Sequence, residues 1–336
     1  MYIRNYLLDY TDENHPTDLK SIQNMLRSHE IEATIKTIRA DINLLDTLDE
    51  MGDECGLEIQ EFLEENEEYK PGTLKWYYTT DRLFDYSELR MLVGTVAASK
   101  VISAKHAKDL IAKIRSLSSE YEKGKINIPV FFDPQSSIMA TNVLINANEI
   151  YVAIEGNRAI SFYYLAFNSE KSLVKRYEEK YIVHPYYLVW ADDAYYLICF
   201  DPKRGDRLVH LRVDRMKDIT PLDAIERRPL KDIIGKEALD LRKYLHKHIN
   251  MYTGESQRVE MQFTNDLISV VIDQFGDDVT IRRGGDENTF FATFDVVISQ
   301  MFFSWCFRFG PRAKIISPEE VKSQYKTALL SQVDSL

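Results

Sequence analysis

The sequence predicts an α+β protein in which helical and β-rich regions follow one another along the chain. Apolar residues recur at helical spacing through most of the first 120 residues. The stretch Tyr181–Ile219 is instead rich in aromatic and β-branched residues between Asp, Pro and Gly, as in antiparallel hairpins. From Arg258 onwards, strand-like and helix-like runs alternate. The 336 residues and 45% hydrophobic content allow two or three domains with ordinary cores.

The first eighty residues predict three helices and a two-stranded wing. We expect helices over Tyr2–Tyr10, after a cap at Thr17 or Asp18, and over about Glu32–Leu48, then strands over Leu57–Phe62 and Leu74–Tyr78. This spacing resembles a winged helix-turn-helix domain, whose later helix enters the major groove of DNA by its N-terminal part.

Four residues near the start of the third helix are therefore candidate DNA contacts: Thr34, Lys36, Thr37 and Arg39. Arg and Lys side chains suit guanine edges or phosphates. The alternative is that Lys36 and Arg39 are solvated helix residues that pair with Glu32 or Asp41.

The net charge argues against a general affinity for polyanions. It is −11 for the whole chain, and residues 1–80 alone hold 7 Lys and Arg against 18 Asp and Glu. The acidic connection between the two wing strands, residues 64–72, should be repelled by phosphate. A local basic site remains compatible with this charge.

A helical linker is predicted after the wing. Asp85 is a plausible N-cap with Glu88 as its capping-box partner. Helices over about Ser87–Ser99 and Ala104–Ser119 should follow, with a break near residues 101–103. A linker at 133–137 and a helix over Thr141–Glu155 then lead into the β-rich stretch.

The β-rich stretch predicts a small twisted sheet with a cationic face. Its expected strands are Tyr181–Val183, Tyr195–Phe200 and Arg207–Val213. His210 and Arg212 share a face because side chains alternate along a strand.

This stretch resembles the WYL domain, which is named for a Trp-Tyr-Leu tripeptide. Here the tripeptide is Tyr195-Tyr196-Leu197, preceded by His184-Pro185-Tyr186-Tyr187-Leu188 and followed by Val213-Asp214-Arg215-Met216, with an upstream strand at Ala159–Tyr164. Near the end, Phe303–Gly310 and Ile316–Glu319 resemble the extension that follows WYL domains. The resemblance implies a small Sm-like β-barrel or sheet and a C-terminal α/β domain.

These observations divide the chain into five segments. They are a winged helix-turn-helix domain (1–82), a helical linker and dimerisation region (83–138), a WYL ligand-sensing domain (139–222), a connector (223–255) and a C-terminal extension (256–336). We expect a loop from Pro221 that becomes a charged helix before Leu245.

The resemblance implies a nucleotide or nucleic-acid ligand on the WYL sheet. Six residues supply aromatic faces, donors and permanent charge for an anion: Tyr163, His184, Tyr196, His210, Arg212 and Arg215. The alternative is that Tyr163 and Tyr196 are core aromatics and that Arg215 pairs with Asp214 or Asp218.

No catalytic or cofactor motif is recognisable, and we expect no enzyme activity, cofactor or metal. His246 and His248 would diverge on a helix. The three cysteines have no metal or redox spacing, which is typical of a reduced, cytoplasmic protein. No apolar run reaches the length of a membrane span, and no signal-peptide pattern is present.

The sequence thus favours a homodimeric, DNA-binding transcriptional regulator that recognises a roughly palindromic operator and senses an anionic ligand. The alternative is an accessory protein that binds single-stranded RNA or DNA through the WYL sheet. An enzyme that acts on nucleotides is a third and weaker hypothesis.

Overall fold

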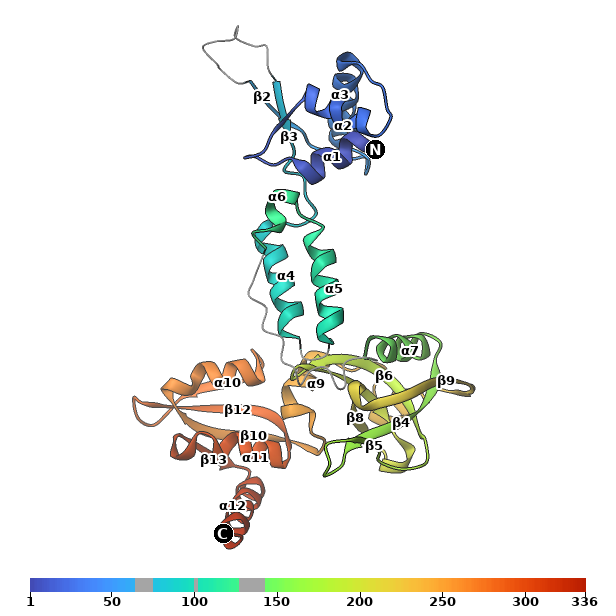
Figure 1. The fold of residues 1–336 in the computed structure, drawn as a ribbon. Coiled ribbons are helices and arrows are strands. Elements are labelled where there is room, and N and C mark those ends of the chain that lie inside the picture. The colour runs from blue at the N-terminus through green and yellow to red at the C-terminus, as the bar shows by residue number, and fades with distance from the viewer. Residues whose placement is uncertain (64–74, 100–101, 127–142) are drawn as a thin grey trace. The chain divides into compact units, whose positions relative to one another are not determined.

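The computed structural model describes residues 1–63, 75–99, 102–126 and 143–336, which form two compact units, Met1–Ala140 and Thr141–Leu336 (Figure 1). The predicted acidic wing connection (64–72) and the linker at 133–137 lie outside the described residues. So do the first residue of the break at 101–103 and the first residues of the helix predicted from Thr141.

The first unit begins with three helices and a three-stranded antiparallel sheet. They are α1 (Tyr2–Tyr10), β1 (Thr17–Asp18), α2 (Leu19–Ser28), α3 (Ile35–Glu50), β2 (Gln60–Leu63) and β3 (Lys75–Tyr78). The strand order is β1-β3-β2. Leu7, Ile22 and Ile38, one from each helix, are fully buried together. This is the winged helix-turn-helix arrangement expected from the spacing of the apolar residues.

Side-chain caps fix where these helices begin. The Asp18 carboxylate accepts a hydrogen bond from the Ser21 backbone N–H at 2.7 Å, as the sequence suggested for α2. The Thr34 hydroxyl accepts from the Thr37 N–H at 3.2 Å and starts α3. Such caps satisfy backbone N–H groups that have no partner within the helix.

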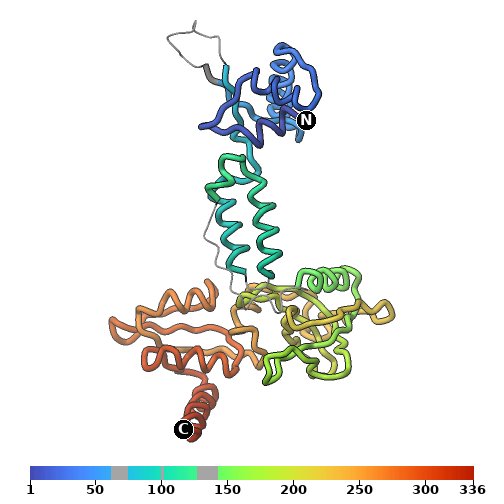
Figure 2. Tube along the Cα trace, in the orientation of Figure 1, coloured from blue at the N-terminus to red at the C-terminus, as the bar shows by residue number. Residues whose placement is uncertain are grey.

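Two longer helices follow, α4 (Tyr86–Ala98) and α5 (Ala104–Arg115), and then the short α6 (Glu120–Lys123). The predicted capping box of Asp85 and Glu88 is confirmed at the start of α4. The helices α4 and α5 lie side by side (Figure 2). Leu89 and Val93 of α4 and Ile111 of α5 are buried in one hydrophobic cluster.

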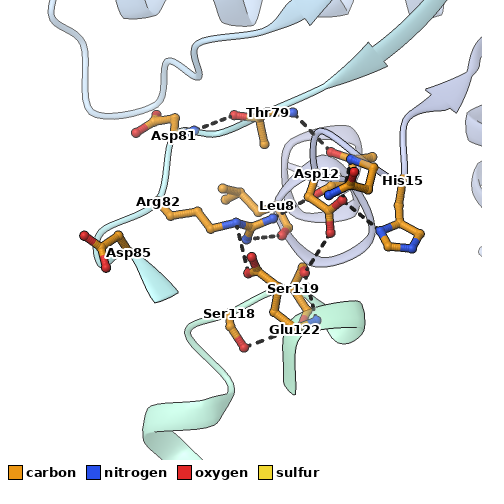
Figure 3. A network of polar contacts seen from close by, with 12 residues as sticks. Leu8, Asp12, His15, Thr79, Asp81, Arg82, Asp85, Ser118, Ser119 and Glu122 are labelled. Atoms are coloured by element: carbon orange, nitrogen blue, oxygen red, sulfur yellow. Dashed lines mark hydrogen bonds and ion pairs between the residues drawn. The ribbon is translucent and has the colours of Figure 1, made fainter. Parts of the chain in front are cut away.

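A polar junction ties the winged head to α6 within the first unit (Figure 3). The Arg82 guanidinium donates to the carbonyl oxygens of Leu8 and Thr11, both at 2.6 Å, and so satisfies the C-terminal end of α1. The Ser119 hydroxyl donates to Asp12 at 3.4 Å. The head and the end of the helical region are therefore held together by side chains from both.

The second unit opens with α7 (Val143–Glu155) and an antiparallel sheet. Its strands are β4 (Arg158–Phe167), β5 (Leu173–Lys175), β6 (Tyr181–Ala191), β7 (Ala194–Phe200), β8 (Leu208–Arg212) and β9 (Met216–Glu226). The order is β5-β4-β6-β7-β8, and β9 also pairs with β4. The curved sheet forms a half-barrel beside α7 (Figure 1). Asp192 and Asp193 make the predicted turn between β6 and β7, and both have positive φ.

The prediction of a loop from Pro221 is wrong, because the strand β9 continues to Glu226. Its residues pair with β4 from Tyr164↔Met216 to Arg158↔Glu226. Pro221 lacks an N–H and suggested a break, but β9 is bonded to β4 alone, and proline is tolerated in an edge strand. The short strand β5 was also not predicted.

The rest of the unit holds two helices, α8 (Lys231–Ile234) and α9 (Leu241–Lys247), and then the extension. The extension contains β10 (Glu255–Thr264), α10 (Ile268–Phe275), β11 (Thr280–Arg283), β12 (Thr289–Ile298), α11 (Gln300–Phe307), β13 (Ala313–Ser317) and α12 (Glu319–Asp334). Its sheet has the order β11-β12-β10-β13. The alternation predicted from residue 258 onwards is confirmed. In the ranges described above, no helix is long and apolar enough to cross a membrane.

Candidate functional site

The start of α3 presents all four predicted DNA contacts to solvent. Thr34, Lys36, Thr37 and Arg39 are exposed, while Ile38 on the opposite face is fully buried. Neither Lys36 nor Arg39 forms an ion pair with any residue that the structure describes, Glu32 and Asp41 included. The two threonine hydroxyls lie 2.9 Å apart and bond to each other.

The cationic residues of the half-barrel sit on a turn that α7 holds in place. The turn Val213–Arg215 lies between β8 and β9. The buried Asn146 side chain donates to the carbonyl oxygens of Val213 and Met216, at 3.2 and 2.7 Å. Buried amides of this kind are costly to leave unbonded, so the turn has a defined position.

Within this turn, Arg212 is bound to Asp214. Its Nε donates to Oδ1 at 3.0 Å and its Nη2 to Oδ2 at 2.7 Å, which is a two-point pair. This pair raises the pKa of Arg212, an effect that burial opposes. One carboxylate thus already neutralises this guanidinium.

Arg215 has no carboxylate partner in the described part of the chain. Its Nε is buried and has no hydrogen-bond partner there. Arg215 adds positive charge near two tyrosines, Tyr164 and Tyr196. Burial nevertheless raises the pKa of both phenols, so both stay neutral and can donate. The Tyr164 hydroxyl also accepts from the Arg212 backbone N–H at 3.2 Å.

Residues 146–221 match the WYL domain family, and they run from α7 through the half-barrel to β9. The protein contains a WYL domain. The resemblance inferred from the tripeptide and the Asp-Arg-Met turn is therefore confirmed.

Two solved structures are similar to the chain. Proteasome accessory factor B/C (PafBC) of Arthrobacter aurescens is 15% identical, with a TM-score of 0.28; the match covers 97% of this chain and 47% of that one. The chain thus spans about half the length of that protein. A CRISPR Cas-related protein is 13% identical, with a TM-score of 0.36, over 98% and 97% of the two chains. No curated protein matches the sequence.

His210 of the WYL domain is engaged on both ring nitrogens. Nδ1 donates to the Met251 carbonyl and Nε2 accepts from the Tyr244 hydroxyl, both at 2.7 Å. Burial lowers the pKa of His210 to about 4, so the ring is neutral. We drop His210 from the proposed ligand set, because it joins β8 to the connector instead of facing a ligand.

The other two predicted residues, Tyr163 and His184, have partners other than Arg215 among the described residues. The Tyr163 ring is covered by lysines, with Lys175 Nζ 3.9 Å and Lys180 Nζ 5.4 Å from its centroid. His184 is half-buried, and its Nδ1 accepts from the Arg228 backbone N–H at 3.0 Å. The predicted set therefore divides over several places on one sheet.

Two hollows in the WYL region contain residues that the sequence reasoning missed. A hollow of about 540 Å³ is lined by Tyr177, Glu178, Glu179, Lys180, Tyr181, Ile182, Asp201, Lys203 and Arg204. The buried Tyr181 hydroxyl has no partner among the described residues, and its ring lies 5.8 Å from that of Tyr164. A second hollow, of about 650 Å³, contains Tyr186, Tyr187, Arg227 and Arg228. Lys203 and Arg204 of the first hollow were not among the predicted residues, and only the fold brings tyrosines beside them.

In the residues that the structure describes, no three His, Cys, Asp or Glu side chains are grouped as metal ligands. The rings of His248 and His210 lie 4.8 Å apart, but the His248 Nδ1 donates to the Tyr244 carbonyl oxygen at 2.6 Å.

Proposed function

We propose that the protein is a homodimeric transcriptional regulator that binds an operator through α3. The observation that carries this proposal is the set of exposed, unpaired cations at the start of α3 in a winged head. Lys36 and Arg39 keep their charge free at the part of the helix that enters the major groove.

The acidic character of the head limits how this binding works. With 18 acids against 7 bases in residues 1–80, long-range attraction to DNA is weak. Affinity must therefore come from close contacts, with Arg39 on base edges and Lys36 on phosphate. Binding of this kind should depend strongly on sequence and less on general phosphate attraction.

We further propose that the WYL sheet senses an anionic nucleotide or nucleic-acid end. Arg215 supplies a charge that is paired with no carboxylate of the described residues, and Tyr196 lies across from Arg212 in the register of β7 and β8. Tyr163 and His184 stay proposed contacts at the margins of the same sheet. We propose no catalytic role and no cofactor, and we expect a cytoplasmic protein with the five segments set out above.

Ligand binding changes operator affinity only if the ligand prefers one arrangement of the two heads. The junction around Arg82 supports such a coupling, since it joins the head to α6 by direct hydrogen bonds. A displacement of the helical region then carries the head with it.

The test is a titration of the full chain with a duplex from its own promoter region and with a scrambled duplex of equal length. We expect tighter binding of the promoter duplex, with affinity falling as salt rises. Equal affinity for both duplexes, even at low salt, would contradict the regulator proposal.

The acidic head also favours a second candidate, an accessory protein that binds single-stranded nucleic acid on the WYL sheet. Replacing Arg212 and Arg215 by Ala separates the two candidates. Loss of single-strand binding supports the accessory role. Intact operator binding with loss of ligand response supports the regulator.

A further inference from the structure

The hollow of about 650 Å³ at the end of the WYL sheet has the features of a binding site for a small anion. Its walls come from the end of α7, from β6, and from the chain that follows β9. Part of it therefore lies beyond residues 146–221, which match the WYL domain. Its lining residues include Asn157, Tyr187, Arg227 and Arg228.

Arg227 is a half-buried charge that is bonded only to neutral oxygens. Its Nε donates to Asn157 Oδ1 at 3.1 Å and its Nη1 to the Pro185 carbonyl at 3.0 Å. Its guanidinium also lies 5.3 Å from the centroid of the Tyr186 ring. In the described residues no carboxylate pairs with it. A guanidinium has five N–H donors, so this one is oriented and still has donors for a ligand.

Arg228 adds a second cation at the mouth of the hollow. Its Nη1 lies 3.9 Å from Asp206, whose side chain is 91% exposed, and such a rim pair contributes little. Its backbone is fixed on both sides, since the N–H donates to His184 Nδ1 and the carbonyl accepts from the Tyr186 hydroxyl at 2.7 Å.

The pKa of the neighbouring His184 reflects the positive charge at this hollow. Burial lowers the pKa of His184, and the charges of Arg228 and Arg227 lower it further. The carboxylates of the hollow have other partners: Glu226 accepts from Asn157 at 2.9 Å and Glu237 pairs with Lys231 at 3.3 Å. An anion in the hollow would therefore meet Arg227, which has no carboxylate partner in the described residues, and Arg228, whose ion pair with Asp206 lies at the exposed rim.

The remaining walls of the hollow suit the organic part of a ligand. Ile154, Pro229 and Leu230 provide apolar surface beside Tyr187. A volume of this size matches sites for small organic ligands, which are about 300–1,000 Å³. Inorganic phosphate alone would fill only a small part of it.

We propose that this hollow binds a phosphate monoester of about mononucleotide size, with its phosphate on Arg227 and Arg228. The site is separate from Arg212. His184 pairs with Phe200 at the end of β7, whereas Arg212 pairs with Tyr196 near its start. Four residues along a strand span about 13 Å.

The test is a calorimetric titration of the full chain with adenosine monophosphate, adenosine and inorganic phosphate. We expect adenosine monophosphate to bind best, phosphate to bind more weakly and adenosine not to bind. The exposed Arg228→Glu change should weaken adenosine monophosphate binding by about tenfold or more. The matched control Arg207→Glu, an exposed arginine outside the hollow, should bind like the wild type.

Arg227→Lys provides a second variant, because it keeps the charge and loses the fork. This variant should bind adenosine monophosphate weakly, and thermal unfolding should show that it is still folded at the temperature of the titration. In the wild type, NMR should show that ligand binding raises the pKa of His184, since the anion offsets the two arginines.

Three results would overturn the proposal: no binding of adenosine monophosphate, binding insensitive to both variants, or phosphate binding as tightly as adenosine monophosphate. This site does not rest on DNA binding. Arg228→Glu should keep operator binding in the absence of ligand, so failure here leaves the regulator proposal standing.

Discussion

Two surfaces of this protein offer cations to an anion, and they differ in what surrounds the charge. On α3, Lys36 and Arg39 are exposed, and neither side chain is ion-paired with a residue that the structure describes. In the WYL domain and directly after it, Arg212 and Arg227 are half-buried and held by fixed acceptors. Flexible, hydrated cations suit a long duplex, where many weak contacts add. Fixed guanidinium groups suit one small ligand, because little entropy is lost when they bind it.

This difference in surroundings also determines whether a substitution changes binding alone or stability as well. A change on α3 should alter binding and leave stability nearly intact. A change on the WYL sheet should alter stability as well, because the polar side chains there satisfy one another. The following predictions use this contrast, from the largest expected effect to the smallest.

The largest effect is expected at His210. Replacing it by Ala leaves the Met251 carbonyl and the Tyr244 hydroxyl without their partner and opens a cavity, so we expect a loss of about 3 kcal/mol in the free energy of unfolding at pH 7.5. Urea unfolding followed by tryptophan fluorescence measures this. The exposed His106→Ala variant should change little.

The pH dependence of this stability follows from the pKa of His210. The pKa is about 4 in the folded protein against an ordinary value of 6.5, so the unfolded chain takes up the proton first. The contribution of neutral His210 is complete above about pH 6.5 and is lost as the pH falls towards 4. Between pH 7.5 and 5 the wild type should lose about 2 kcal/mol more than His210→Phe. An equal loss in both proteins would contradict the assigned hydrogen bonds.

The next effect separates the two kinds of arginine. Arg212→Ala leaves the Asp214 carboxylate, whose side chain is 10% exposed, without its pair. We expect a loss of about 2 kcal/mol in stability, reduced by solvent screening because Arg212 is itself 36% exposed. Arg39→Ala should change stability by less than about 0.5 kcal/mol. Chemical unfolding measures both losses. Similar losses of unfolding free energy in Arg212→Ala and Arg39→Ala would contradict the distinction between the paired arginine of the WYL sheet and the exposed arginine of α3.

A smaller effect is expected at Thr34, which both caps α3 and faces the expected DNA. Thr34→Ala should destabilise the head by about 1 kcal/mol through loss of the cap. Thr34→Asp restores a capping oxygen, so it should recover stability while weakening operator binding by repulsion of phosphate. If Thr34→Asp recovered both stability and operator binding, Thr34 would not lie close to the DNA.

The smallest effect concerns Lys36. If Lys36 contacts a phosphate, Lys36→Ala should weaken binding of the promoter duplex and of the scrambled duplex equally, by a few-fold. It should also lower the slope of log affinity against log salt concentration by about one. Arg27→Ala, an exposed arginine at the end of α2, is the control and should leave the slope unchanged. Anisotropy titrations at several salt concentrations decide between these outcomes.

The features that could be predicted from sequence are those with local causes. The caps at Asp18 and Asp85 were visible because a cap and its partner lie within three residues of each other. The exposure of Arg39 followed from helical spacing, and the WYL domain from a run of motifs. The strand β9 was missed because its bonds go to β4, more than fifty residues earlier, while Pro221 suggested a break.

The WYL ligand residues were harder to predict for the same reason. Tyr244 and Met251, which bond to the two ring nitrogens of His210, are more than thirty residues away in the sequence. No pattern near His210 predicts these partners. Asp214 was considered as a partner for Arg215, but it binds Arg212 instead. Arg227 was not among the predicted residues, because only the fold places it beside Asn157.

The most direct test of this account compares operator binding by Arg39→Ala and Arg227→Lys in parallel, with no ligand added. Loss of one bidentate base contact should weaken operator binding of Arg39→Ala by roughly 5- to 150-fold, while Arg227→Lys binds the operator like the wild type. Unchanged binding by Arg39→Ala, together with lost binding by Arg227→Lys, would contradict the assignment of DNA to α3 and of the small anion to the WYL domain.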